Sequence, residues 1–327
     1  MPAALETWLR RTMAAAAAGA NRADPADRRR YAVAATLVAS GIAHLGVQAV
    51  AGGAWDGPVS WRKPATFGLA FGVTLATLTA VTRLVPVSPR RRARLLTAFA
   101  IACVGEVAVI TTQAWRGVPS HFNVSTPVNG AFAYTAAAGG AVLIGTTLAF
   151  AVPALRGDPA AAPSVRLGVR AGFISFLTAL GFGAAMIAIG VRAGRVVSQD
   201  AAYTAARHLV AGHAATMHGI LVLPGMAWLA TRTDWSEAER LRRVRLACAG
   251  YLVAAGAVVL ESVAGLDPVA AGPATAVGGA VTLAGLVLVA AVAAATVRAA
   301  LRPTVRPTSG GRPGASPSPA TPSPLRP

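Results

Sequence analysis

The 327-residue chain is 54% hydrophobic and only 13% charged, and its formal net charge is +18. Soluble domains carry about 25% charged residues, so this composition argues against an ordinary soluble enzyme and indicates a membrane protein. The two cysteines, Cys103 and Cys248, form neither a disulfide framework nor a zinc-ligand spacing. We interpret both as small apolar residues within helices.

Eight apolar windows follow one another along the chain. A helix that crosses about 30 Å of hydrocarbon needs about 20 apolar residues, and each window has roughly that length. The connections are short and contain Pro, Gly, Asp and Ser, which favour turns. We therefore predict an all-α, polytopic transmembrane helical bundle. Its spans are placed near 31–52, 65–85, 95–114, 130–152, 168–191, 208–230, 246–266 and 275–297.

Segments 1–30 and 298–327 flank the predicted transmembrane helical domain, 31–297. Residues 13–20 follow two arginines, but this stretch is too short and too weakly apolar for the core of a signal peptide. We expect segment 1–30 to be cytoplasmic and to include an Ala-rich helix. The tail 298–327 is rich in Pro, Ser and Arg and cannot bury a core, so we expect it to be disordered in the cytoplasm.

The distribution of basic residues predicts the orientation of the spans. Of the 30 basic residues, 29 are arginines and one is Lys63. With both termini in the cytoplasm, 24 of the 30 lie in cytoplasmic segments and six in outer loops, as the positive-inside rule requires. Because the charge follows topology, we expect no nucleic-acid partner. The predicted location is the cell (plasma) membrane, with the lipid bilayer as the surrounding partner.

Several polar residues fall inside the predicted spans, where an ionisable side chain costs about 2.5–3.5 kcal/mol. Glu106 and Gln113 are seven residues apart, which places them about 20° apart on one helix face. Glu106 and Glu261 fall in the third and seventh spans, as in a four-plus-four repeat, although the surrounding sequences do not align. The predicted intramembrane polar site consists of His44, Gln48, Glu106, Gln113, His213, His218 and Glu261.

Two outer loops carry further polar and aromatic residues: WDGPVSWRKP before the second span and QAWRGVPSHFNVSTP after the third. Their shared depth predicts that they line the mouth of an outward-facing, water-accessible pocket above the intramembrane site. Basic side chains at this mouth would attract a small anionic solute. The predicted rim consists of Trp61, Arg62, Lys63, Arg116, Ser120, His121 and Asn123.

These residues also have a structural interpretation. Glu106 could join helices as a protonated or His-paired carboxyl group, and His213 could be a packing residue. Arg62, Lys63 and Arg116 could anchor helix ends at the membrane surface. However, a helical bundle needs few buried polar pairs for specificity. The combination of acids, histidines and glutamines at similar depth therefore favours a functional site.

Three blocks, WRKPATFGLAFG, QAWRGVPSHFN and HGILVLPGMAWL, resemble those of a family of bacterial, actinobacterial-type multi-pass membrane proteins. Its members carry similar Trp-x-Lys-Pro, Gln-x-x-Arg-Gly-x-x-Ser-His-Phe-Asn and Met-His-Gly blocks. The resemblance covers most of the first six spans, and SHFN is its most specific part. It implies a multi-pass membrane fold and draws attention to these blocks, but it implies no particular reaction.

Two classes of function fit these residues. The first is a carrier or sensor of a small molecule or ion, in which buried Glu and His side chains load and release protons. The second is a membrane-embedded, metal-dependent enzyme acting on a lipid or envelope precursor, with zinc held by His121, His213 and His218 and a glutamate as general base. A third alternative is a b-type haem bound between His44 and either His213 or His218. We expect the first class, with no cofactor firmly implied.

Overall fold

The computed structural model describes residues 24–198, 200–266 and 272–301. These residues form helices and no strands, and eight spans are long and apolar enough to cross a membrane. The chain is therefore a multi-pass helical membrane protein. The helices are α2 (Pro25–Ala51), α3 (Arg62–Val81) with the 3-10 turn η1 (Thr82–Leu84), α4 (Pro89–Trp115), α5 (Pro127–Arg156), α6 (Pro163–Val196), α7 (Ala201–Thr204), α8 (Leu209–Met217), α9 (Gly219–Ala230), α10 (Glu237–Val263) and α11 (Pro273–Ala300).

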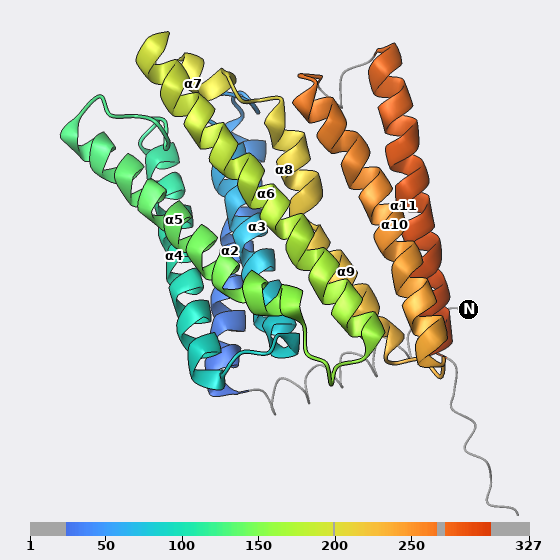
Figure 1. Ribbon diagram of the computed structural model, residues 1–327. Coiled ribbons are helices and arrows are strands. Elements are labelled where there is room, and N and C mark those ends of the chain that lie inside the picture. The colour runs from blue at the N-terminus through green and yellow to red at the C-terminus, as the bar shows by residue number, and fades with distance from the viewer. Residues whose placement is uncertain (1–23, 199, 267–271, 302–327) are drawn as a thin grey trace, which may run out of the picture.

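The spans pack in two groups. In the first, α2 packs on α3 and α4, α3 on α4, and α4 on α5. In the second, α6 packs on α8, α9 and α10, and α10 packs on α8, α9 and α11. Figure 1 shows α4 and α5 at one side of the molecule and α10 and α11 at the other. Both groups therefore follow the same order of helix contacts, and they meet where α5 lies against α6 and α3 against α9.

The first span begins earlier than the apolar pattern indicates. Helix α2 starts at Pro25 rather than near residue 31, because Asp24 caps it by accepting a hydrogen bond of 2.8 Å from the backbone N–H of Ala26. Proline suits the first helical turn because its missing N–H is not needed there. The predictions for residues 1–23 and 302–327 lie outside the described residues, and residues 298–300 are the last of α11.

Close contact between α2 and α3 depends on small residues. A Cβ atom added to Gly68 would lie 2.8 Å from the backbone nitrogen of Gly41 and 2.8 Å from the carbonyl oxygen of Leu37. A side chain at residue 68 would therefore separate the two helices. Membrane bundles use close contacts of this kind in place of a hydrophobic driving force.

The sixth span is not one continuous helix. The predicted span near 208–230 is confirmed as Leu209–Ala230, but its helix is interrupted at one residue: α8 ends at Met217 and α9 begins at Gly219, with His218 between them. Within α9, Pro224 has no N–H and removes one further helical hydrogen bond. Where a helix is interrupted inside the membrane, nearby backbone carbonyls that lose their helical N–H donors must accept hydrogen bonds from other groups.

Candidate functional site

Glu106 lies on α4 and faces α5. Its side chain is only 5% exposed. A Cβ atom added to Gly139 of α5 would lie 2.7 Å from Oε1 of Glu106. The carboxyl group therefore occupies the space that any side chain at residue 139 would need. Gln113 also faces α5, since its Nε2 donates to Oδ1 of Asn129 at 3.3 Å, in keeping with the shared helix face of Glu106 and Gln113.

Glu261 occupies a similar place in the second group of helices. It is 7% exposed on α10, and its carboxyl group lies against Gly278 of α11, where an added Cβ atom would collide with it. Its Oε1 is buried and has no hydrogen-bond partner. In each group, a buried glutamate of the third span thus packs against a glycine of the fourth. Glu261 lies near the end of its helix, whereas Glu106 lies farther from the end of α4.

Side chains from α6 and α10 satisfy the carbonyls beside the break in the sixth span. The bonds run from Ser175 Oγ to Thr216 O at 2.6 Å, from Tyr251 Oη to Ala215 O, and from His218 Nδ1 to Ala214 O at 2.6 Å. Because hydrocarbon offers no water, freed carbonyls need such partners. Hydrogen bonds from two neighbouring helices, α6 and α10, therefore stabilise the interruption of the sixth span.

His213 and His218 point in different directions. His213 Nδ1 is 2.8 Å from the carbonyl oxygen of Ala179 on α6, whereas His218 is exposed and bonds within its own span. A carbonyl only accepts, so each Nδ1 is the donor and carries the proton. Each Nε2 is then left to bind a proton or another ligand. His213 and His218 therefore do not lie together on one helix face, as the two zinc-binding histidines of a zincin metalloprotease do.

His44 belongs to an aromatic cluster at the opposite end of the bundle from the start of α2. Its ring stacks on Trp61 at 6.3 Å between centroids, and Trp61 meets Trp115 edge-on at 4.9 Å. Trp115 Nε1 donates to His44 Nε2 at 3.2 Å, and His44 Nδ1 bonds the carbonyl oxygen of Ser40 at 2.7 Å. The indole is only a donor and the carbonyl only an acceptor. His44 is therefore neutral and uses both ring nitrogens in packing contacts.

Gln48, one helical turn beyond His44, serves the end of α2. Its Nε2 donates to the carbonyl oxygens of Gly52 and Gly53, both at 3.2 Å. Arg62 and Arg207 share the carboxylate of Asp56, at 3.4 Å and 2.9 Å. These contacts tie the ends of α2, α3 and α7 together, which agrees with an anchoring role for Arg62.

A polar network fixes the loop between α4 and α5. Arg116 Nη1 donates to Oε1 of Gln113 and, at 3.0 Å, to Oδ1 of Asn129. Asn129 Nδ2 donates to Ser125 Oγ at 3.1 Å, and Ser125 Oγ donates to Asn123 Oδ1 at 2.7 Å. Gln113, Asn123 and Asn129 are all buried. Much of the QxxRGxxSHFN block therefore holds the loop in shape.

Phe122 anchors the tip of this loop against α6. It is the one non-glycine residue with a positive φ, 60°, in the described part of the chain. A Cβ atom added to Gly190 of α6 would lie 2.9 Å from Cε2 of Phe122. The left-handed backbone of a phenylalanine costs about 1–3 kcal/mol and persists only where surrounding contacts enforce it. The seating of the ring at Gly190 is such a contact.

His121 and Lys63 lie beside this anchor. The His121 ring contacts Phe67 at 5.9 Å and Phe122 at 6.2 Å between centroids. Burial, together with the positive charge of Lys63, lowers the pKa of His121 to about 4, so its ring is neutral at pH 7. Lys63 Nζ donates to the carbonyl oxygen of Pro58 at 2.7 Å and lies 5.6 Å from the centroid of the Tyr203 ring.

Ser120 and His121 make the one contact between a serine hydroxyl and a histidine ring nitrogen in the described residues, 2.9 Å from Oγ to Nδ1. Such a contact can activate a hydroxyl nucleophile when a carboxylate orients the histidine and the serine is accessible. Ser120 is only 3% exposed, and no carboxylate bonds His121 among the described residues. The contact therefore packs the loop.

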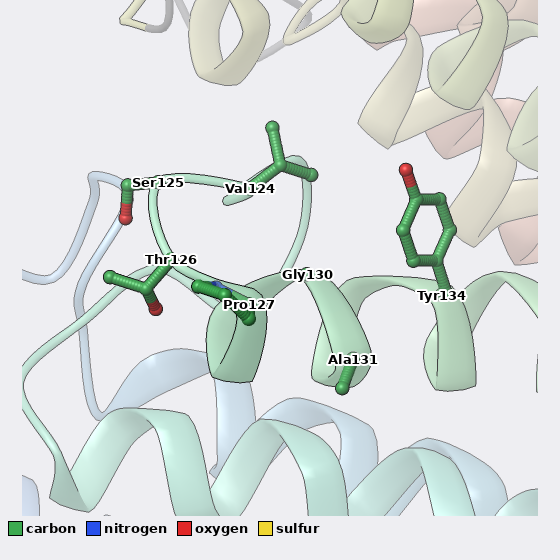
Figure 2. Close-up of a pocket in the computed structure, with 7 residues that line it drawn as sticks. All are labelled: Val124, Ser125, Thr126, Pro127, Gly130, Ala131 and Tyr134. Carbon is green, nitrogen blue, oxygen red and sulfur yellow. The ribbon is translucent and has the colours of Figure 1, made fainter.

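The space under the loop is nearly closed. A gap of about 170 Å³ is bordered by Ser60, Lys63, Ile110, Ala114 and Ser120, but it has no room for a water-sized sphere. A wider, open depression lies on the outer side of the loop, and Figure 2 shows Val124, Thr126 and Tyr134 around it. Four residues of the predicted intramembrane polar site, His44, Glu106, His218 and Glu261, line neither space.

The structure thus groups the predicted site residues into separate contacts. His44 and Trp61 form one cluster, Gln113, Arg116 and Asn123 another, and Lys63 lies with His121. Glu106 and Glu261 lie at two different helix pairs. No group of three or more His, Cys, Asp or Glu side chains able to hold a metal ion occurs within the described residues.

Sequence reasoning missed a charged centre at the other end of the bundle. Asp27 is 1% exposed, and three arginines pair with it: Arg30 at 2.6 Å, Arg83 at 2.9 Å and Arg92 at 3.0 Å. They come from α2, η1 and α4. The signal was present, since Asp27 and Arg30 have the i, i+3 spacing of a helical ion pair, but these arginines were assigned only to topology.

No family model, curated protein or solved structure matches this chain. The resemblance of the three sequence blocks to a bacterial membrane-protein family therefore stays a prediction. The fold and the contacts define a class, a helical multi-pass membrane protein with buried glutamates at helix–helix contacts. Its function has to be argued from those contacts.

Proposed function

We propose that this chain is a carrier of a small molecule or ion whose working cycle takes up and releases a proton at Glu106. The observation that carries the proposal is the contact between Glu106 and Gly139. The carboxyl group is 5% exposed within a membrane span, and no ion pair involves it among the described residues. An ionised carboxylate in such surroundings is expensive, so Glu106 keeps its proton while α4 and α5 stay packed.

Release of the proton requires that water reach the carboxyl group. Because Gly139 leaves no gap beside Glu106, hydration needs a movement of α5 away from α4. Proton loss and helix movement are then coupled, since each favours the other. Glu261 against Gly278 offers the same coupling between α10 and α11. A carrier with two such groups can open one helix pair at a time.

The broken sixth span supports the same proposal. Carriers commonly bind their cargo near discontinuous helices at the junction of two helix groups. Here α9 contacts α3 of the other group, and His218 lies at the break, where its Nε2 forms no hydrogen bond with the described residues. In the proposed carrier, cargo would bind beside this break, where the second helix group contacts the first.

We further propose that both termini face the cytoplasm of a cell with the protein in its plasma membrane. At the end of the bundle where α2 begins, 17 arginines occur among the described residues, whereas the other end has five arginines and Lys63. This asymmetry follows the positive-inside rule. At the second end, the exposed acidic residues that oppose these six cations in the described part of the chain are Asp56 and Asp200, which favours an anionic solute.

A pH step applied to reconstituted protein tests the proposed function. Proteoliposomes adsorbed on a solid support are exposed to a rapid pH change, and the displaced charge is recorded. We expect a transient charge movement with the wild-type protein and a smaller one in Glu106→Gln, which cannot take up a proton at residue 106 and keeps only the contribution of Glu261. Glu239→Gln is the control, because Glu239 pairs with Arg242 and Arg243 at the helix end.

A charge movement that Glu106→Gln leaves unchanged would contradict the proposal, as would its absence in the wild-type protein. Circular dichroism and size-exclusion chromatography of each variant separate loss of function from loss of fold. Once a charge movement is seen, candidate anions are screened as carried solutes in the same preparation.

A further inference from the structure

The charged centre at Asp27 leaves a large excess of positive charge at one end of the bundle. Its three arginines satisfy one carboxylate, so the centre itself has a net charge of about +2 by count of the paired groups. Arg92 and Arg30 are held by further bonds, from Arg92 Nε to Thr82 Oγ1 at 3.0 Å and from Arg30 Nη2 to the carbonyl oxygen of Ala93 at 3.1 Å. These bonds hold the side chains of the charged centre in fixed positions.

Further arginines, which have no acidic partner among the described residues, surround this charged centre. Arg30 links the first turns of α2 and α4, which lie together at one end of the bundle (Figure 1). Around them, Arg28, Arg29, Arg90, Arg91 and Arg94 are exposed. None of these five forms an ion pair within the described residues. Segments 24–30 and 83–94 together contain eight arginines and two aspartates.

The position of these charges is electrostatically unfavourable for the protein alone. Arg90 and Arg91 lie in the first turn of α4, which contains no acidic residue. The amino end of a helix carries partial positive charge, so cations there are destabilising by a few tenths of a kcal/mol or more each. Mutual repulsion among the exposed arginines adds to this. A bound anion removes both penalties.

We propose that the arginine patch around Asp27, formed by Arg28, Arg29, Arg83, Arg90, Arg91 and Arg94, binds the phosphate group of an anionic lipid. Arg83 is bonded to Asp27 through Nε and Nη2, which leaves its Nη1 as a donor, and its side chain is 47% exposed. Guanidinium groups are well suited to phosphate oxygens. Trp228 and Trp235, which stack with Arg232 and Arg243, mark the membrane surface at the same end.

Lipid is favoured over a soluble anion by the depth of the patch. Exposed arginines at a span end lie at the level of lipid phosphates, and such basic patches recognise anionic headgroups. Each arginine near the surface contributes about a fivefold factor in affinity. This inference stands apart from the proposed carrier function, because it uses no residue of the Glu106 or Glu261 contacts.

Thermal unfolding of the full chain in a neutral detergent tests the patch. The protein is titrated in parallel with phosphatidylglycerol, phosphatidylcholine and inorganic phosphate. We expect a rise in unfolding temperature that saturates with phosphatidylglycerol alone. Arg90→Gln/Arg94→Gln should need about 25-fold more of this lipid for half the effect. The matched control is Arg242→Gln/Arg243→Gln, which removes two charges at the same end that already pair with Glu239, and it should stay within about twofold.

Equal stabilisation by phosphatidylcholine would contradict charge recognition, and an equal effect of inorganic phosphate would assign the patch to a soluble anion instead. An unchanged titration of Arg90→Gln/Arg94→Gln would contradict the assigned residues. If that variant does not fold, native mass spectrometry of the wild-type protein replaces it. Adducts of phosphatidylglycerol should then fall with rising ionic strength, and salt-insensitive adducts would overturn the proposal.

Discussion

The carboxyl group of Glu106 fills the place where a side chain of Gly139 would be, so that an added Cβ atom would approach Oε1 to 2.7 Å. This relationship makes the two residues interdependent. A larger residue at 139 needs the carboxyl group to move, and an ionised carboxyl group is costly at a residue that is only 5% exposed. In the proposed function, the packing of α4 on α5 and the protonation of Glu106 are therefore parts of one equilibrium.

Gly139→Ala should destabilise the protein by about 1–3 kcal/mol, because it overpacks the contact with Glu106. Thermal unfolding in detergent measures this loss. Gly140→Ala is the control, since an added Cβ atom at Gly140 would meet nothing within 4 Å. Similar unfolding temperatures for the two variants would show that Glu106 does not occupy the space at Gly139.

Asp27→Asn should destabilise the protein by about 3–5 kcal/mol, because it leaves the buried Arg30 and the partly buried Arg92 without their counter-charge. We expect low yield and a strongly lowered unfolding temperature. Asp158→Asn is the control, because no ion pair involves Asp158 among the described residues, although its side chain caps the turn at Ala160. Equal unfolding temperatures would rule out Asp27 as the centre that joins α2, η1 and α4.

The pH dependence of stability should report on His121. Its pKa is lowered from 6.5 to about 4 in the folded protein, so the unfolded chain takes up a proton at higher pH than the folded one. The stabilisation is therefore complete above about pH 6.5 and is lost as the pH falls towards 4. The loss amounts to at most about 3 kcal/mol. Unfolding temperatures measured between about pH 4 and 6.5 test whether stability is lost over this pH range.

His121→Gln should remove this part of the pH dependence. His208→Gln is a useful comparison, because it also removes one histidine but takes no part in the ring contacts of His121 with Phe67 and Phe122. If the acid-induced loss of stability were the same in His121→Gln as in the wild-type protein, another group would be responsible.

The orientation of the bundle is tested with single cysteines in a Cys103→Ala/Cys248→Ala background. Val124→Cys lies in the loop after α4 at a side chain that is 57% exposed, and Ala160→Cys lies in the exposed turn between α5 and α6. An impermeant thiol reagent added to intact cells should label Val124→Cys alone. Labelling of Ala160→Cys instead would invert the proposed orientation.

The sequence predicted the number and type of spans because apolar length depends on the bilayer, not on partner helices. It also indicated that Glu106 and Gln113 share a face, since helical spacing alone decides this. The break at His218 was missed, because it depends on donors from Ser175 and Tyr251, which lie on other helices. Which partners a polar side chain finds is a tertiary property.

Asp27 also shows that a sequence reveals local contacts but not contacts between distant elements. Its pairing with Arg30 is local and could have been read from the spacing, but its pairing with Arg83 and Arg92 joins elements far apart in the chain. A positive-inside count treats every arginine alike. The contacts show instead that some arginines are bound in a buried centre and others are exposed without an acidic partner.

The protonation state of Glu106 tests the central claim most directly. Infrared difference spectra of wild-type protein and Glu106→Gln, reconstituted in lipid at neutral pH, isolate the signal of this one carboxyl group. We predict that the wild-type protein has a carbonyl band of a protonated carboxylic acid that Glu106→Gln lacks, and that this band shifts in heavy water. Loss of an ionised carboxylate band in Glu106→Gln, with no change in the protonated region, would contradict the account.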